Sequence, residues 1–192
     1  MNRTKALFIF LAFSLPSLAQ RHYAGIAGVE ASAGSNLFHG ISPYASIEYS
    51  KYKSRVSFWK FGMNYLQKEF EYDKGELPSG NVFSSSIPQG DPSFTRHADN
   101  IYFNASYNRT VATNRTSFFL NLGLGALTGV EIYRQDKKQY DFIAGGKLEA
   151  ELEYFIASRT ALVGHLTQLW SPLSDIREWN TTWQVGIKYL IY

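Results

Sequence analysis

The chain contains no cysteine, which excludes disulfide bonds and the cysteine-linked lipid anchor of a lipoprotein. Neither sign of charge predominates. The chain has 19 Lys and Arg residues against 16 Asp and Glu residues, for a formal net charge of +3. A chain this close to neutral lacks the basic excess on which nucleic acid binding depends. We therefore expect no direct contact with nucleic acid.

Long hydrophobic runs are missing everywhere except at the N-terminus. The apolar stretch from Ala6 to Leu15 is shorter than the roughly 20 residues that a transmembrane helix needs. Arg3 and Lys5 precede it, and Ser17-Leu18-Ala19 supplies a small-x-small cleavage site. We predict an export signal over residues 1–19 and a mature chain of residues 20–192 that forms a single domain. Cleavage would remove both signal cations and bring the chain closer to neutral.

Aromatic residues are abundant, at 16% of the chain, and apolar residues recur at every second position. In the run 99–111, for example, Ile101, Phe103 and Ala105 alternate with polar or smaller neighbours such as Asn104 and Ser106. This two-residue period is typical of β-strands with one apolar face. Only in the run 160–170 does the sequence not show which alternate residues form the apolar face. The predicted strands cover about residues 26–34, 44–52, 55–72, 99–111, 117–134, 142–156, 160–170 and 183–192.

The connections between these runs alternate in length. Short links at 51–54, 112–115 and 157–159 alternate with longer ones, the largest at about 73–97 and rich in Ser, Gly and Pro. Tight turns at one end and loops at the other are typical of outer-membrane barrels, whose short turns are periplasmic. The loop at 73–97 is the best candidate for partner contact, with a disordered spacer as the alternative.

Four charged residues of the run 142–156, at positions 147, 149, 151 and 153, share one face, and several charges of other runs have the matching inward position. Facing lipid near the midplane, a Lys would cost about 2–4 kcal/mol and each Glu less. In a small barrel the lumen is just wide enough to be filled by side chains, so acid–base pairs there would neutralise one another. We predict such a cluster inside the barrel, made of Glu30, Glu48, Lys60, Glu131, Lys147, Glu149, Glu151, Glu153 and Lys188.

The apolar face would then contact lipid. The predicted insertion strand ends on the aromatic Tyr192, as those of membrane barrels do, and its apolar positions Trp183, Val185, Ile187, Tyr189 and Ile191 share the outward face. Tyr and Trp favour the headgroup level of a membrane. Ten such residues near strand ends are expected there: Tyr44, Tyr49, Tyr52, Tyr72, Tyr107, Tyr133, Tyr140, Trp170, Trp179 and Tyr189. The fold class predicted is all-β: an eight-stranded antiparallel up-and-down transmembrane β-barrel of the outer-membrane type.

Two other classes of protein compete with this interpretation. A soluble lipocalin-like binding protein for an apolar ligand would direct Leu120 and Leu122 inward. An enzyme in the barrel would need a converging acid, base and nucleophile, and the sequence shows no such set. The four His residues do not have the spacing of metal ligands, so no metal is expected, and no cofactor is expected either. We predict that His22 and His97 lie on the solvated surface.

Parts of the mature chain resemble the conjugative transposon protein TraO family of Bacteroides-type elements. The resemblance rests on QRHYAGIAGVE at residues 20–30, FIAGGKL at 142–148, Ser158-Arg159, Trp170 and Gly186, although Ala24 stands where that family would have Pro. It implies a non-enzymatic component of a conjugative DNA-transfer apparatus, with other apparatus proteins as partners. A general small outer-membrane barrel unrelated to conjugation is the alternative. Both place the protein in the cell outer membrane, in contact with lipid.

Overall fold

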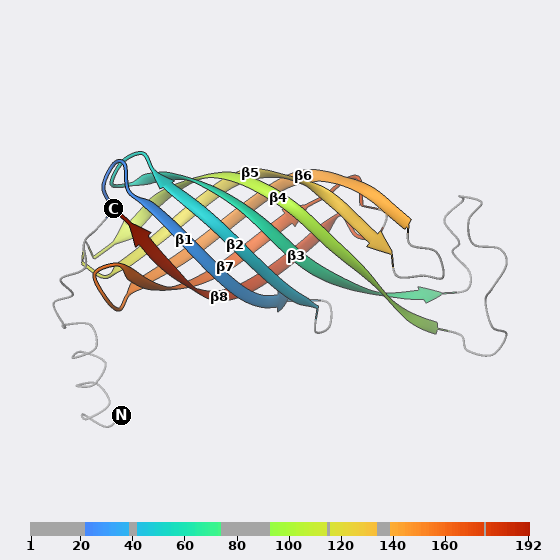
Figure 1. The fold of residues 1–192 in the computed structure, drawn as a ribbon. Coiled ribbons are helices and arrows are strands. Elements are labelled where there is room, and N and C mark those ends of the chain that lie inside the picture. Colours follow the sequence, from blue (N-terminus) through green and yellow to red (C-terminus); the bar gives the residue numbers. More distant parts are fainter. Residues whose placement is uncertain (1–21, 39–41, 74–92, 115, 134–138, 175) are drawn as a thin grey trace, which may run out of the picture.

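The computed structural model describes residues 22–38, 42–73, 93–114, 116–133, 139–174 and 176–192. Each strand pairs antiparallel with the next, and β1 pairs with β8 to close the barrel (Figure 1). The predicted fold is therefore confirmed. No helix in the described ranges is long and apolar enough to cross a membrane. The strands are β1 (Ala27–Asn36), β2 (Pro43–Tyr52), β3 (Ser57–Asp73), β4 (Ser93–Thr113), β5 (Phe118–Tyr133), β6 (Gln139–Phe155), β7 (Thr160–Trp170) and β8 (Trp179–Ile191).

The strands follow the predicted runs, although β6 and β8 begin three and four residues earlier than predicted, and the largest difference lies at the long loop. β4 begins at Ser93 and pairs with β3 as far as Asp73, so residues 93–97 belong to a strand and not to a loop. Polar residues and the nearby Pro92 hid this extension, because they weaken the apolar alternation by which a strand is recognised. The rest of the predicted loop, residues 74–92, lies outside the described residues, as does the predicted export signal.

The two ends of the barrel differ in their connections. Three four-residue turns, at 53–56, 114–117 and 156–159, join β2 to β3, β4 to β5 and β6 to β7 at one end (Figure 1). Asn114 closes one of them, since its Oδ1 accepts the backbone N–H groups of Thr116, Ser117 and Phe118 at 2.9–3.0 Å. Such side-chain acceptors are how Asn fixes a turn. We call this the turn end, and the opposite one the loop end.

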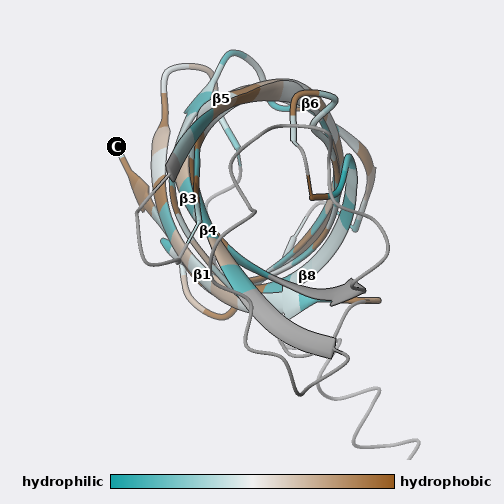
Figure 2. Ribbon diagram, turned by 90° about the vertical axis from the view of Figure 1, so that its right-hand side faces the viewer, coloured by the Kyte–Doolittle hydropathy of each residue, from teal (hydrophilic) through white to brown (hydrophobic). Residues whose placement is uncertain are grey.

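The alternation of the sequence becomes an outer and an inner wall. On β2, Ile47 is 61% exposed on the outside whereas its neighbour Glu48 is 3% exposed inside. On β7, whose phase the sequence left open, Val163, His165 and Leu169 are buried inside. Leu122 is half exposed on the outer wall, opposite to the orientation that a soluble binding barrel requires. Figure 2, seen from the loop end, shows the closed ring with hydrophilic and hydrophobic residues alternating along the strands.

The lumen is layered along its axis. An apolar cluster at the turn end includes Tyr52, Phe58, Phe119 and Phe155. A second cluster nearer the loop end includes Tyr44, Leu66, Tyr102, Leu127, Ile143 and Leu169. Buried charges lie between the two layers, in an environment of low dielectric where unpaired charge would be costly.

Candidate functional site: the charged lumen

The nine charged residues predicted for the lumen all lie inside the barrel, each 4% exposed or less. They come from six strands, since every inward position of a strand projects toward the same axis. Eight of them form one network, whereas Glu131 lies apart toward the loop end. We call the network, together with His165, the lumen ion cluster: Glu30 on β1, Glu48 on β2, Lys60 on β3, Lys147, Glu149, Glu151 and Glu153 on β6, His165 on β7 and Lys188 on β8.

Lys60 is the hub of the lumen ion cluster. Its Nζ lies 3.0 Å from Glu48 and 2.8 Å from Glu149, contacts Glu151 as well, and lies 3.6 Å from Glu30. These partners belong to β1, β2 and β6, so one ammonium group ties together distant parts of the wall. Charge-assisted hydrogen bonds of this kind are stronger than neutral ones, and these side chains are almost fully buried.

Two further lysines, Lys188 and Lys147, pair with the carboxylates of the lumen ion cluster. The Nζ of Lys188 lies 2.5 Å from Glu151, 2.8 Å from Glu153 and 3.3 Å from Glu30. Lys147 binds Glu48 at 2.9 Å and Glu149 at 2.6 Å. The Nζ of Lys188 also lies 5.3 Å from the ring centroid of Phe58, where the ion cluster borders the apolar layer of the turn end.

His165 is the member that spacing in the sequence did not reveal. Its Nδ1 lies 2.8 Å from Glu149, within a hydrogen bond, and its Nε2 lies 2.6 Å from Glu30, within ion-pair distance. Only the doubly protonated imidazole has a donor on both nitrogens, and this form adds a positive charge to a cluster of five carboxylates and three lysines. His165 lies on β7, where the sequence did not show which residues face inward, and it was therefore not predicted as a lumen residue.

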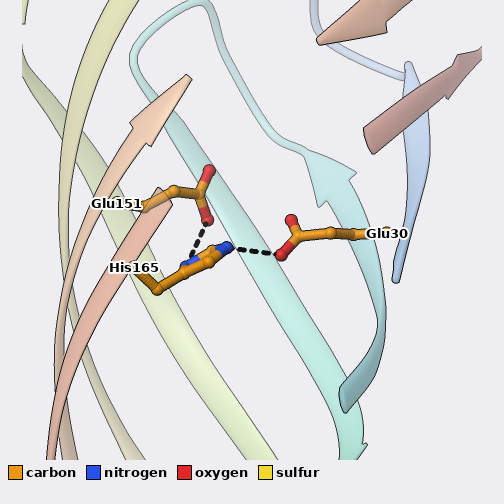
Figure 3. A group of neighbouring side chains, drawn as sticks. All are labelled: Glu30, Glu151 and His165. Carbon is orange, nitrogen blue, oxygen red and sulfur yellow. Dashed lines mark ion pairs between the residues drawn. The ribbon is translucent and has the colours of Figure 1, made fainter. Parts of the chain in front are cut away.

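A possible metal site is formed by Glu30, Glu151 and His165 (Figure 3). Each offers one ligand atom, and the three atoms lie within 4.8 Å of one another, a spacing that could hold a metal ion. Both carboxylates, however, already contact ammonium groups of Lys60 and Lys188. A cation entering here would have to displace or approach those groups. The geometry therefore fits an ion-paired imidazolium better than a metal ligand.

The prediction that His22 is solvated surface is wrong. His22 is 1% exposed and packs against the rings of Tyr52 and Phe119 with centroids 4.3 Å apart, while its Nε2 lies 2.9 Å from Glu153. The segment before β1 thus enters the turn end of the lumen. Sequence periodicity could not show this, because His22 precedes the first strand. His97, the other His read as surface, lies on β4 and is half-buried.

A smaller polar group lies at the loop end of the lumen. Lys68 donates to Glu131 at 2.9 Å and to Ser174 at 2.9 Å, and Ser174 in turn donates to Glu131. Ser174 belongs to the link between β7 and β8, so the contact fixes this link to the inner wall. Lys68 has the inward parity of Lys60 and could have been found by continuing the alternation of β3.

The headgroup assignment is wrong for two tyrosines. Tyr44 and Tyr52 are 2% and 1% exposed inside the lumen, because they share the parity of Glu48 on β2. The Tyr44 hydroxyl donates to Asn64 at 2.7 Å. Tyr133 is half-buried, with its hydroxyl 3.0 Å from Glu131, and the side chain of Tyr72 lies outside the described residues. The other six are exposed on the outer wall: Tyr49, Tyr107, Tyr140, Trp170, Trp179 and Tyr189.

The predicted insertion strand lies on β8 with its apolar side chains outside. Their exposed fractions range from 43% to 60%: Trp183, Val185, Ile187, Tyr189, Ile191 and Tyr192. Lys188 and Gln184, between them in sequence, are buried inside. Because β8 pairs with both β7 and β1, this strand also closes the barrel.

Comparison with solved structures finds the same fold. A major outer membrane protein from Thermus thermophilus has a TM-score of 0.57 at 12% identity, covering 88% of this chain and 100% of that one. The N-terminal β-barrel domain of Pseudomonas aeruginosa OprF has a TM-score of 0.56 at 6% identity, covering 87% and 98%. Neisserial surface protein A has a TM-score of 0.52 at 10% identity, covering 85% and 95%. The chain thus has the fold of small outer-membrane β-barrels. No family model and no curated protein matches it.

Proposed function

We propose that this chain is an outer-membrane barrel with a structural or interaction role and no catalytic activity. The observation that carries the proposal is the distribution of polarity between the walls. Buried ion pairs lie inside, between two apolar layers, whereas Phe103, Leu124 and Val185 are 60% to 67% exposed outside. A surface of this kind is stable in hydrocarbon and unfavourable in water. The inner carboxylates are bonded to lysines and closed off, so they offer no accessible acid or base to a substrate.

The lumen geometry further supports a barrel without an open pore. Lys60 and Glu149 connect β3 to β6 across the inside, and His22 lies among aromatic rings at the turn end. An ion would have to break several buried charge pairs to pass. We expect no steady conductance when the purified protein is inserted into planar bilayers, and a stable open channel would contradict the closed lumen.

Membrane insertion itself is tested by fractionation. The protein should sediment with outer membrane, resist extraction by salt, and migrate faster on gels before boiling than after. Heat-modifiable migration reports the closed barrel, because strands paired around the full ring resist detergent until heated. Recovery of a soluble periplasmic monomer without detergent would overturn the proposal.

The specific role we propose is in a conjugative transfer apparatus, with partners bound through the ends of the barrel. Its support is the resemblance of the mature N-terminus and of residues 142–148 to the TraO family. The test is deletion of the gene in a donor strain, followed by conjugation frequency and by crosslinking from turn and loop positions. A donor that transfers DNA normally would refute this role while leaving the membrane barrel intact.

A further inference from the structure

Charge is distributed unequally between the two ends of the barrel. The three turns at 53–56, 114–117 and 156–159 contain Lys53, Arg55, Arg115 and Arg159 and no acidic residue. In the links of the loop end, at 37–42, 74–92, 134–138 and 171–178, acidic and basic residues balance. A chain that is close to neutral as a whole therefore presents one basic end.

The structure adds strand residues to this basic end. Lys51 on β2 and Arg109 on β4 are exposed on the outer wall beside the turns, as are Lys53, Arg55 and Arg159 in them. We call these five residues the basic rim. In the described part of the chain no ion pair involves any of them, and the acids near this end, such as Glu153, are buried in the lumen. Within the described residues, their positive charge is thus not neutralised by an acidic side chain.

Aromatic side chains lie among these cations. Lys51 pairs in register with Trp59, and Trp59 with Tyr107, whose rings contact edge to face at 5.2 Å. The guanidinium of Arg159 lies 4.9 Å from the ring centroid of Tyr192, and that of Arg55 lies 5.4 Å from Tyr23. Aromatic rings favour the headgroup level of a membrane, which places the basic rim against lipid phosphates.

We propose that the basic rim binds anionic glycerophospholipid headgroups and so fixes the depth and direction of the barrel in its membrane. The inference rests on the proposed membrane location. Four of the cations lie on β2, β4 and the turn between β2 and β3, and Arg159 lies apart in the turn between β6 and β7. Several small headgroups match this spread better than one compact ligand. Exposed cations next to a bilayer each add attraction to anionic lipid, and salt screens this attraction.

The test compares two lipids at the protein boundary. The full barrel is inserted into phosphatidylcholine vesicles that contain trace spin-labelled phosphatidylglycerol or spin-labelled phosphatidylcholine. The motionally restricted fraction then gives the relative affinity for each lipid. We expect a preference for phosphatidylglycerol of about fivefold at low salt, falling as salt is raised.

Matched variants assign the preference to the turn end. K53Q/R55Q/R159Q neutralises three cations of the basic rim, and R134Q/K137Q/K138Q removes the same charge from the link between β5 and β6 at the loop end. The first variant should markedly weaken the preference, since only two of the five rim cations remain, and the second should keep it. Equal affinity of the wild type for both lipids, or equal loss in both variants, would overturn the inference, and an acidic protein partner would then be the remaining candidate. Heat-modifiable migration, checked in the same samples, separates this result from failure of insertion.

Discussion

The Nζ of Lys60 on β3 lies 2.8 Å from Oε1 of Glu149 on β6, joining two strands that are not neighbours in the sheet. The backbone ladder of a barrel holds only adjacent strands together. Contacts of this kind therefore stabilise the closed cross-section from within. Their energies depend on complete pairing, since one missing partner leaves buried charge uncompensated.

Replacing Lys60 with Met should destabilise the folded barrel by about 3–5 kcal/mol, because its carboxylate partners would remain buried without their ammonium group. The measurement is urea unfolding in detergent micelles or vesicles, followed by loss of heat-modifiable migration. K53M removes the same charge from an exposed turn and should change the unfolding free energy little. Equal effects of both substitutions would show that the lumen ion cluster does not stabilise the fold.

Replacing His22 with Ala should lower the unfolding free energy by roughly 1.5–3 kcal/mol, the usual contribution of a hydrogen bond to a charged group. The imidazole is buried among rings and lies 2.9 Å from Glu153, so its loss removes both packing and pairing at the turn end. Y23A, which alters the adjacent and more exposed side chain, serves as control. A variant as stable as the wild type would place His22 outside the lumen.

Replacing Leu124 with Arg should oppose insertion by about 2–4 kcal/mol, because this position lies near the middle of β5 on the outer wall. The yield of heat-modifiable protein after refolding into vesicles measures the effect. S158R introduces the same side chain in an exposed turn and should insert normally. Full tolerance of Arg at position 124 would contradict contact with hydrocarbon.

Replacing Gly125 with Ala should cost about 1–3 kcal/mol by overpacking. A Cβ at this position would overlap the carbonyl oxygen of Ala105 and lie 2.6 Å from the Cβ of Ser106, so neighbouring backbone would have to move. At Gly164 the nearest atom would lie 3.9 Å away, and G164A should be neutral or slightly stabilising. Unfolding midpoints of the two variants give the comparison, and the reverse order would refute the close approach of β4 and β5.

Several features followed from alternation alone, as β2 and β6 illustrate. Glu48 and Glu151 had to share a face with other polar residues, and burying that face in a membrane barrel is far less costly than exposing it to lipid. Tyr44 and Tyr52 were misassigned by their place near strand ends, although their parity with Glu48 directs them inward. Whether a residue is odd or even along the strand decides which wall its side chain faces, and nearness to a strand end does not change this, because a side chain cannot cross its own sheet.

The sequence by itself determined the number and approximate positions of the strands, the identity of the charged face and the difference between the two ends, because these depend on a two-residue period and on turn chemistry. Only the tertiary structure decided which charges meet. Closing the barrel brings Lys60 to Glu149 and His165 to Glu30, and it admits His22 among the aromatic rings. Those contacts depend on the register of every pair of strands around the ring, which local sequence does not fix.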